Sequence, residues 1–179
     1  MAKNKRRTSN RRQNPQPKKK VFSNLGSRFS FLESHYICTM QFKEVSLEQI
    51  NAFNKNTLME VLGIECVEVG TDFIVSTMPV DHRTHQPMGL LHGGASAALI
   101  ESIGSMGSTL LIDLTKEYPV GLEVNANHVG GVKEGFVKAI GKIVHAGKRT
   151  HLWQVDIFDG TTNRLVCTGR LTVMIIPRS

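Results

Sequence analysis

One carboxylate, Glu101, lies in a stretch of sequence that is otherwise free of charge. The segment 94–111 is rich in Ala, Leu, Ile and small residues at helical spacing. A carboxylate inside an apolar helix is costly unless it is paired or functional. Partial desolvation would make Glu101 a stronger base or nucleophile, and Ser105 shares its face of the helix. The alternative is a glutamate that reaches solvent from one edge of the helix, and the residue alone does not decide between the two.

This helix begins at two glycines, Gly93 and Gly94. Glycines let the chain approach a ligand closely, and the first N–H groups of a helix have no partner inside it. With the helix dipole, these donors predict a site for an oxyanion or a polarised carbonyl. His92 could cap the helix or orient a substrate. Gln86 could donate to a carbonyl or brace the loop.

Other kinds of site find less support in the spacing of residues. Asp81, His82, His85 and His92 invite a metal hypothesis, but their spacing matches no common zinc pattern. The sequence contains neither a Gly-x-Ser-x-Gly elbow nor a phosphate-binding loop motif. Its three cysteines form no CxxC pair, so we predict buried or incidental thiols.

Two short helices and two strands are predicted before the long loop Pro79–His92. A capping box at Ser46–Gln49 opens a helix through Phe53, and Thr57–Leu62 adds a turn that stops at Gly63. Segments Ile64–Val69 and Phe73–Met78 read as strands joined by a turn.

The long loop Pro79–His92 leads into a helix over Gly94–Leu111, which we expect to be buried because it is apolar on most faces. The strand segments that follow are Val120–His128, Phe136–His145, His151–Phe158 and Leu165–Ile175. No helix separates these strands, which favours antiparallel meander pairing. We therefore predict an α+β fold in which an antiparallel sheet wraps around one long helix.

The positive charge is concentrated at the N-terminus. Residues 1–39 hold ten Lys or Arg and one acidic residue. The remainder of the chain holds twelve Lys or Arg and fourteen Asp or Glu. The expected domain, residues 40–179, is therefore mildly acidic, which argues against a nucleic-acid-binding surface. No apolar run reaches the ~20 residues of a membrane span or reads as a signal peptide, so we expect a cytoplasmic protein without membrane contact.

Residues 1–39 are predicted to be a basic, disordered extension. Three interpretations stay open: an arm that binds nucleic acid or another polyanion, an organelle-targeting segment, or an extension outside the native chain. The last is preferred, because Met40 offers a second start.

The segment Asp81–Met106 resembles the active-site segment of hot-dog-fold acyl-CoA thioesterases, in the branch of the 4-hydroxybenzoyl-CoA and phenylacetate-pathway enzymes. Within this branch it is most similar to the 1,4-dihydroxy-2-naphthoyl-CoA hydrolases of menaquinone synthesis. The resemblance spans Met40–Ile176 and rests on five stretches: His85–Pro87, Gly89–Leu99, Glu101 with Gly104–Met106, Val120–His128, and His145–Thr150 with Trp153.

The resemblance implies hydrolysis of an aromatic or medium-chain acyl-CoA, with no metal and no cofactor beyond the CoA of the substrate. It implies that Glu101 is the nucleophile or general base. The thioester carbonyl would be held by the Gly93 N–H with Gln86 and His92, and Ser105 and His128 would position the water or acyl group. Contacts to CoA would come from Lys148, Arg149 and Thr150.

The family pairs two subunits, so the resemblance also implies a homodimer or a dimer of dimers. Its active sites would lie at the interface, with Gln86 and His92 from one chain and Glu101 from the other. Two alternatives remain: a hot-dog dehydratase of β-hydroxyacyl thioesters, and a non-catalytic acyl-CoA-binding protein whose basic tail contacts nucleic acid.

Overall fold

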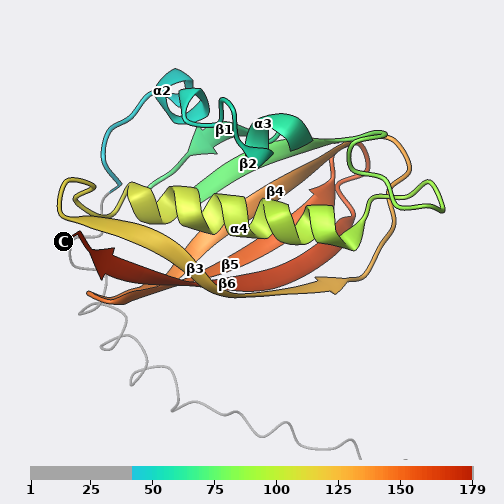
Figure 1. Ribbon diagram of the computed structural model, residues 1–179. Helices are drawn as coiled ribbons and strands as arrows, with labels where there is room; N and C mark the ends of the chain where they lie inside the picture. The colour runs from blue at the N-terminus through green and yellow to red at the C-terminus, as the bar shows by residue number, and fades with distance from the viewer. Residues whose placement is uncertain (1–41, 179) are drawn as a thin grey trace, which may run out of the picture. The chain divides into compact units, whose positions relative to one another are not determined.

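The computed structural model describes residues 42–178, so the predictions for residues 1–39, Cys38 included, lie outside the described residues. The predicted α+β class is confirmed (Figure 1). Along the chain the elements are α2 (Leu47–Ala52), α3 (Leu58–Leu62), β1 (Glu65–Val69), β2 (Phe73–Val80), α4 (Gly93–Thr109), β3 (Glu117–His128), β4 (Gly135–Ala146), β5 (Thr150–Asp159) and β6 (Leu165–Pro177).

The two short helices form where their capping signals predict them. Ser46 and Gln49 make the reciprocal hydrogen bonds of a capping box at the start of α2. Helix α3 ends at Gly63, whose φ of 67° is the left-handed conformation that glycine adopts readily. The side chain of Asn51 ties α2 to β1, because it donates to the carbonyl of Cys66 at 2.9 Å and accepts from its N–H at 2.8 Å.

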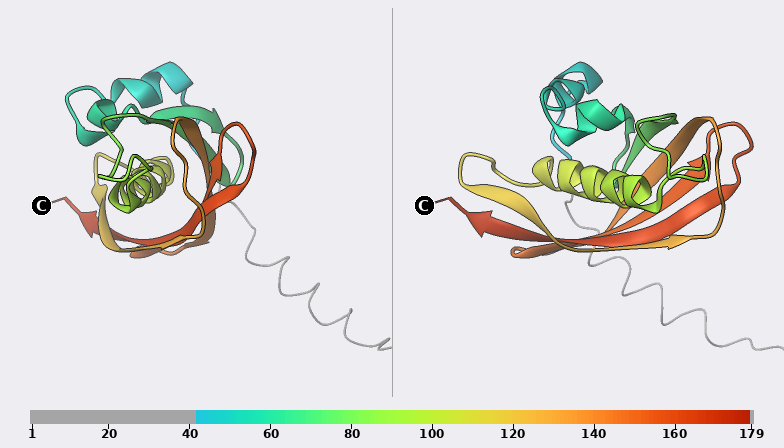
Figure 2. Two further views of the ribbon diagram at one scale, coloured as in Figure 1. Left: turned by 90° about the vertical axis from the view of Figure 1, so that its right-hand side faces the viewer. Right: turned by 45° about the vertical axis from the view of Figure 1, so that its right-hand side comes forward.

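The six strands form one antiparallel sheet in the order β1-β2-β4-β5-β6-β3. The meander prediction is therefore correct for β4, β5 and β6 and wrong for β3, which pairs with β6 at the far edge. The sheet curves around α4, as the end-on view shows (Figure 2). This curvature leaves β3 lying along one side of the helix.

Helix α4 buries one face and leaves the opposite face open. Its buried residues recur in pairs four positions apart, as a single helical face requires. They are Ala95, Ser96, Leu99, Ile100, Ile103, Gly104, Gly107 and Ser108. The helix is therefore largely buried, as expected from its apolar residues, and within it only Gly94 and Glu101 are exposed, while Ser102 and Ser105 beside Glu101 are partly buried.

Trp153 of β5 packs into α4 at a place where the helix has only small residues. A methyl group at Gly107 would lie 2.2 Å from the Trp153 ring, so glycine is required for this approach. The indole N–H donates to Oγ of Ser108 at 3.0 Å, and Nδ1 of His151 lies 3.0 Å from the same oxygen. Phe42 also stacks on the ring, with ring centroids 6.1 Å apart.

Strand β3 contains a bulge at Leu122. Gly121 pairs with Val173 of β6, and Glu123 pairs with the next residue of β6, so Leu122 has no opposite residue. An extra residue in one strand reverses which face the following side chains occupy. Val124 and Ala126 therefore pack against the core, although Leu122, at the same parity, is 58% exposed.

Candidate functional site

A cleft of about 650 Å³ opens along the unburied face of α4. Its walls are α4 on one side, α2 and α3 on the other, and the start of β3 at one end. Apolar side chains make most of the lining: Val45, Ile50, Phe53, Leu58, Met59, Ala98, Met106, Leu110, Leu114 and Pro119. This volume and this lining are typical of sites for small organic ligands.

Glu101 lies at this cleft together with Ser105, so the prediction that the two residues share a face is confirmed. Among the described residues that line the cleft, Glu101 carries its only carboxylate. On the single chain the Glu101 side chain is exposed. The predicted partial desolvation is therefore not produced by this chain's own fold, because the buried stripe of α4 faces the other way.

The start of α4 is capped by His92, whose Nδ1 accepts a hydrogen bond from the Gly94 N–H at 2.7 Å. The prediction that both glycine N–H groups are free is therefore wrong for Gly94. The carbonyl of His92 accepts from Ala95 and Ser96. Gly93 donates no hydrogen bond to any described residue and is only half-buried, so its N–H is available to a ligand.

The loop before α4 is held by hydrogen bonds that fix Gln86 near the helix start. The buried hydroxyl of Thr84 donates to the carbonyl of Pro79, and the carbonyl of Thr84 accepts from the His92 N–H at 2.8 Å. The Gln86 N–H donates to the carbonyl of Leu90 at 2.8 Å. The Gln86 side-chain oxygen accepts from the Met88 N–H, which leaves its amide N–H groups directed to no described acceptor.

Asp81, His82 and His85 belong to this loop and do not form a metal-binding cluster. Arg83 makes a two-point ion pair with Asp81, which holds the pKa of that carboxyl well below its usual range. Nε2 of His85 lies 2.9 Å from the carbonyl of Lys133. Across residues 42–178, no three His, Cys, Asp or Glu side chains gather in a way that could hold a metal ion.

Strand β3 approaches α4 at two points that matter for the site. The imidazole of His128 lies against the helix start, because a methyl group at Gly93 would be 2.7 Å from its Nε2. The carboxylate of Glu101 lies against Gly121, where a methyl group would be 2.5 Å from Oε1. Both neighbours come from the edge strand whose position the sequence did not predict.

The candidate residues therefore form two groups on one chain. His92, Gly93 and His128 lie together at the N-terminus of α4, with Gln86 in the loop that leads into it, whereas Glu101 and Ser105 lie further along the helix. Gly93 and Glu101 are eight positions apart, which corresponds to roughly 12 Å along a helix. A single carbonyl group cannot contact both groups on the same chain.

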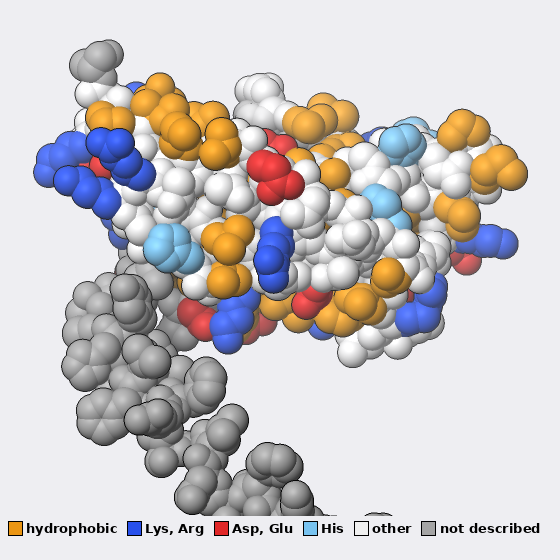
Figure 3. Space-filling model, turned by 90° about the horizontal axis from the view of Figure 1, so that it is seen from below, with side chains coloured by type: hydrophobic (Ala, Val, Ile, Leu, Met, Phe, Trp, Pro, Cys, Tyr) orange, Lys and Arg blue, Asp and Glu red, His pale blue; other side chains and the backbone are white. Residues whose placement is uncertain are grey.

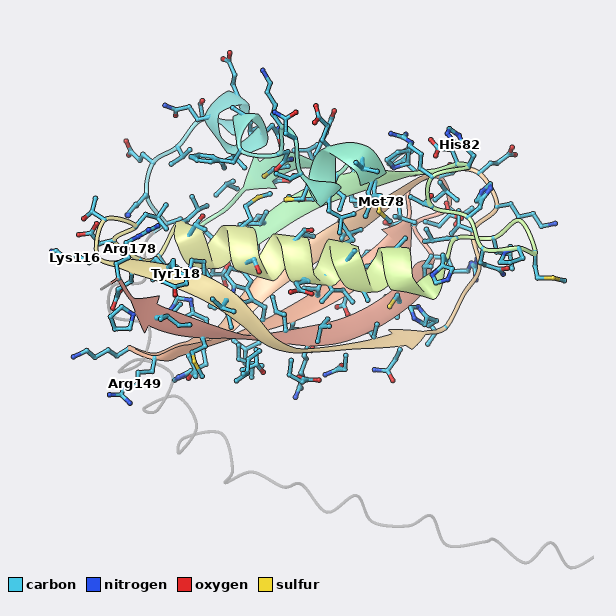
Figure 4. The ribbon with its side chains drawn as sticks, viewed as in Figure 1. Met78, His82, Lys116, Tyr118, Arg149 and Arg178 are labelled. Carbon is cyan, nitrogen blue, oxygen red and sulfur yellow. The ribbon has the colours of Figure 1, made fainter. Side chains whose placement is uncertain are left out.

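The residues expected to contact CoA lie elsewhere. Lys148 and Arg149 are exposed in the turn before β5, and Thr150 begins that strand. Figure 4 shows Arg149 at the end of the sheet where Lys116 and Arg178 also lie, whereas His82 marks the opposite end. Lys and Arg side chains gather at this same end in the view from below (Figure 3). The structure does not bring this basic end together with Gln86 and His92.

Two contributions to the site are absent from the sequence predictions. The apolar wall from α2 and α3, above all Phe53 and Leu58, was not expected because its helices are far from Glu101 in sequence. Gly121 was not singled out as a neighbour of Glu101. An isolated glycine within a strand is a signal of a bulge or of close approach by another group, and this signal could have identified it.

Cys66 and Cys167 are free and buried, as predicted, and burial raises the pKa of both thiols. None of the helices described between residues 42 and 178 has the length and apolarity that crossing a membrane requires. The two thiols belong to neither of the two groups of candidate site residues.

Comparison with known proteins places the chain in a family. The family model of the Thioesterase superfamily matches residues 88–166. The 1,4-dihydroxy-2-naphthoyl-CoA hydrolase of Escherichia coli is 45% identical over 134 residues, which cover 75% of this chain and 97% of the relative. The proofreading thioesterase EntH of Cronobacter turicensis is 42% identical over 134 residues, covering 75% of this chain and 96% of the relative.

A solved structure has the same fold. It is a mutant thioesterase PA1618 from Pseudomonas aeruginosa in which a glutamine is replaced by alanine. It superposes with a TM-score of 0.75 at 42% identity and covers 78% of this chain and 100% of its own.

Proposed function

The chain belongs to the thioesterase superfamily and is a thioester hydrolase with the hot-dog fold, and from this premise we propose that it hydrolyses an aromatic or medium-chain acyl-CoA with Glu101 as the catalytic carboxylate. The observation that carries the proposal is the position of Glu101 at the wall of a large apolar cleft. The cleft would take the acyl group, and Glu101 would act on the thioester carbonyl at its edge.

The acyl group is expected to be aromatic, and 1,4-dihydroxy-2-naphthoyl-CoA is the first substrate to test because a 45% identical relative is named for its hydrolysis. The cleft volume suits a fused-ring group, and its apolar lining would remove that group from water. Ser105 and Thr109 supply hydroxyl groups at the same wall for substituents on the ring.

In the proposed reaction the carbonyl carbon is attacked by water that Glu101 deprotonates, or by Glu101 itself. The developing oxyanion accepts hydrogen bonds from the Gly93 N–H and the Gln86 amide, with the helix dipole adding to this stabilisation. The carbon–sulfur bond then breaks and CoA leaves as a thiolate, which takes up a proton. Direct attack requires a second step, in which water hydrolyses the acyl–Glu101 anhydride.

The separation of roughly 12 Å between Gly93 and Glu101 along α4 supports an active site made by two subunits. Donor and attacking group must both lie within about 3 Å of the reacting carbonyl group. We therefore propose a homodimer, alone or within a dimer of dimers, in which Gln86 and Gly93 of one subunit face the partner subunit's Glu101. The same contact would remove Glu101 from water.

Replacement of Glu101 by Gln tests the catalytic assignment. We expect kcat to fall by about 10²–10⁴-fold, the usual contribution of a general base, because the amide can neither deprotonate water nor attack. Release of free CoA thiol is measured with a thiol-reactive dye on a panel of aromatic and aliphatic acyl-CoAs, and binding of CoA is measured by calorimetry.

Glu123→Gln is the matched control, because Glu123 is an exposed carboxylate on β3 outside the cleft. It should keep wild-type turnover. Wild-type turnover by Glu101→Gln would refute the assignment, and absence of thiol release from every acyl-CoA by the wild-type protein would refute the proposed substrate class.

A further inference from the structure

Gly121 is the β3 residue that faces the Glu101 carboxylate. A Cβ atom at this position would lie 2.5 Å from Oε1 of Glu101 and 3.3 Å from its Cδ. Real Cβ atoms essentially never come so close to another heavy atom. The Glu101 carboxylate therefore occupies space that any other residue at position 121 would fill.

The glycine is not required by its backbone conformation. The glycines with φ in the left-handed region among the described residues are Gly63, Gly89 and Gly135, and Gly121 is not one of them. Its backbone would accept an L-amino acid without strain. A side chain is excluded at position 121 for steric reasons, because it would occupy the space that the Glu101 carboxylate fills.

The bulge at Leu122 extends this arrangement to the other half of the site. Gly121 and His128 are seven positions apart, so in a regular strand they would point to opposite faces of the sheet. The one-residue bulge between them reverses the parity, and both residues face α4. Gly121 thereby meets Glu101, and His128 meets Gly93.

We propose that Gly121, with the bulge at Leu122, is a positioning element that sets the orientation of the Glu101 carboxylate and aligns β3 along the site. This inference rests on the proposed role of Glu101. Gly121 acts through Glu101 and supplies no chemical group of its own.

The test is Gly121→Ala. The atom in conflict is the far end of a flexible side chain, so Glu101 is expected to turn away while the fold is kept. A displacement of about 1 Å at a catalytic group reduces the rate by about 10²-fold, so we expect kcat to fall by about this factor. KM and the melting temperature should change little.

Gly131→Ala is the matched control. Gly131 also lies outside the left-handed region, and an added methyl group there would meet only Leu90 side-chain atoms, at an ordinary 3.5 Å. This variant should keep the wild-type kcat. Equal losses in the two variants would mean that alanine at Gly121 acts through general damage and would overturn the proposal.

A second variant separates positioning from a merely structural role. Asp at position 101 is one methylene shorter, so in the Gly121→Ala background its carboxylate fits beside the added methyl group. If the two effects were independent, the fold-loss in kcat of the double variant Gly121→Ala/Glu101→Asp would equal the product of the two single fold-losses. We expect it to be smaller than that product by about fivefold or more, because residues in contact couple. Losses that simply multiply would overturn the inference.

The outcomes distinguish this inference from the proposed function. Wild-type turnover by Glu101→Gln would remove the catalytic role of Glu101, and the positioning role with it. An inactive Glu101→Gln together with a fully active Gly121→Ala would leave the proposed function intact and refute only the role of Gly121.

Discussion

His151 is a buried titratable side chain whose only hydrogen-bond partner among the described residues is Ser108. It is 3% exposed, and burial lowers its pKa, with a smaller lowering from the charge of nearby His145. An unfolded histidine has a pKa of about 6.5. Below that pH the unfolded chain therefore binds a proton that folded His151 does not. The contribution of this group to stability is complete above pH ~6.5 and declines as the pH falls.

His151→Asn should flatten this dependence. Asn keeps a polar atom near the position of Nδ1 but does not titrate, so it removes the proton uptake of the unfolded state. We expect the free energy of unfolding of the wild-type protein to fall more than that of the variant between pH 7.5 and 5. Urea denaturation at both pH values measures the difference, and parallel losses in the two proteins would contradict the prediction.

At the level of single residues, the sequence placed the candidate residues on the helix better than it described their surroundings. The helical spacing of Glu101 and Ser105 is enough to place both on one face. It contains no information on what that face meets, so neither Phe53 nor the exposure of Glu101 could be predicted. The sequence allows two roles for His92, and its bond from the Gly94 N–H shows that it caps the helix.

Among the elements, α4 depends on small residues where Trp153 crosses it. Gly107→Ala should lower the free energy of unfolding, because overpacking a core costs about 1–3 kcal/mol. The better helix propensity of alanine, about 1 kcal/mol, offsets only part of this cost, because the Trp153 ring is fully buried and cannot move aside. Chemical denaturation of the variant measures the loss.

Gly131→Ala again serves as the control, since its added methyl group makes only ordinary contacts. A Gly107→Ala protein as stable as this control would show that the contact between Trp153 and α4 can relax. The glycine would then reflect no packing requirement.

Strand boundaries were predictable and strand faces were not. The segment predicted at Val120–His128 lies within β3, where Val120, Leu122 and Val124 would share one face if the strand were regular. Val120 and Leu122 are 40% and 58% exposed, because the bulge changes the parity before Val124. A pattern of period two cannot reveal where one residue is inserted, and it does not state which strand pairs with which.

For the whole molecule, the two groups of site residues predict complementation between subunits. Gln86→Ala and Glu101→Gln should each be nearly inactive alone. Mixed at equal concentration under conditions that exchange subunits, they should recover about one quarter of the wild-type activity, because half of the dimers are mixed and each mixed dimer has one intact site.

Thiol release from the mixture, compared with each variant alone, gives the readout. No recovery after verified subunit exchange would show that Gln86 and Glu101 act within one chain. A mixture of Glu101→Gln with Glu101→Ala is the control, because every site then lacks the carboxylate.

The packing of Trp153 has an optical consequence. It is the chain's single tryptophan, fully buried against α4, stacked on Phe42 and hydrogen-bonded through its indole N–H to Ser108. Its fluorescence therefore reports on one place, the contact between the sheet and the buried stripe of the helix. The ring meets the helix at Gly104, Gly107 and Ser108, so the emission follows the integrity of the core at this contact.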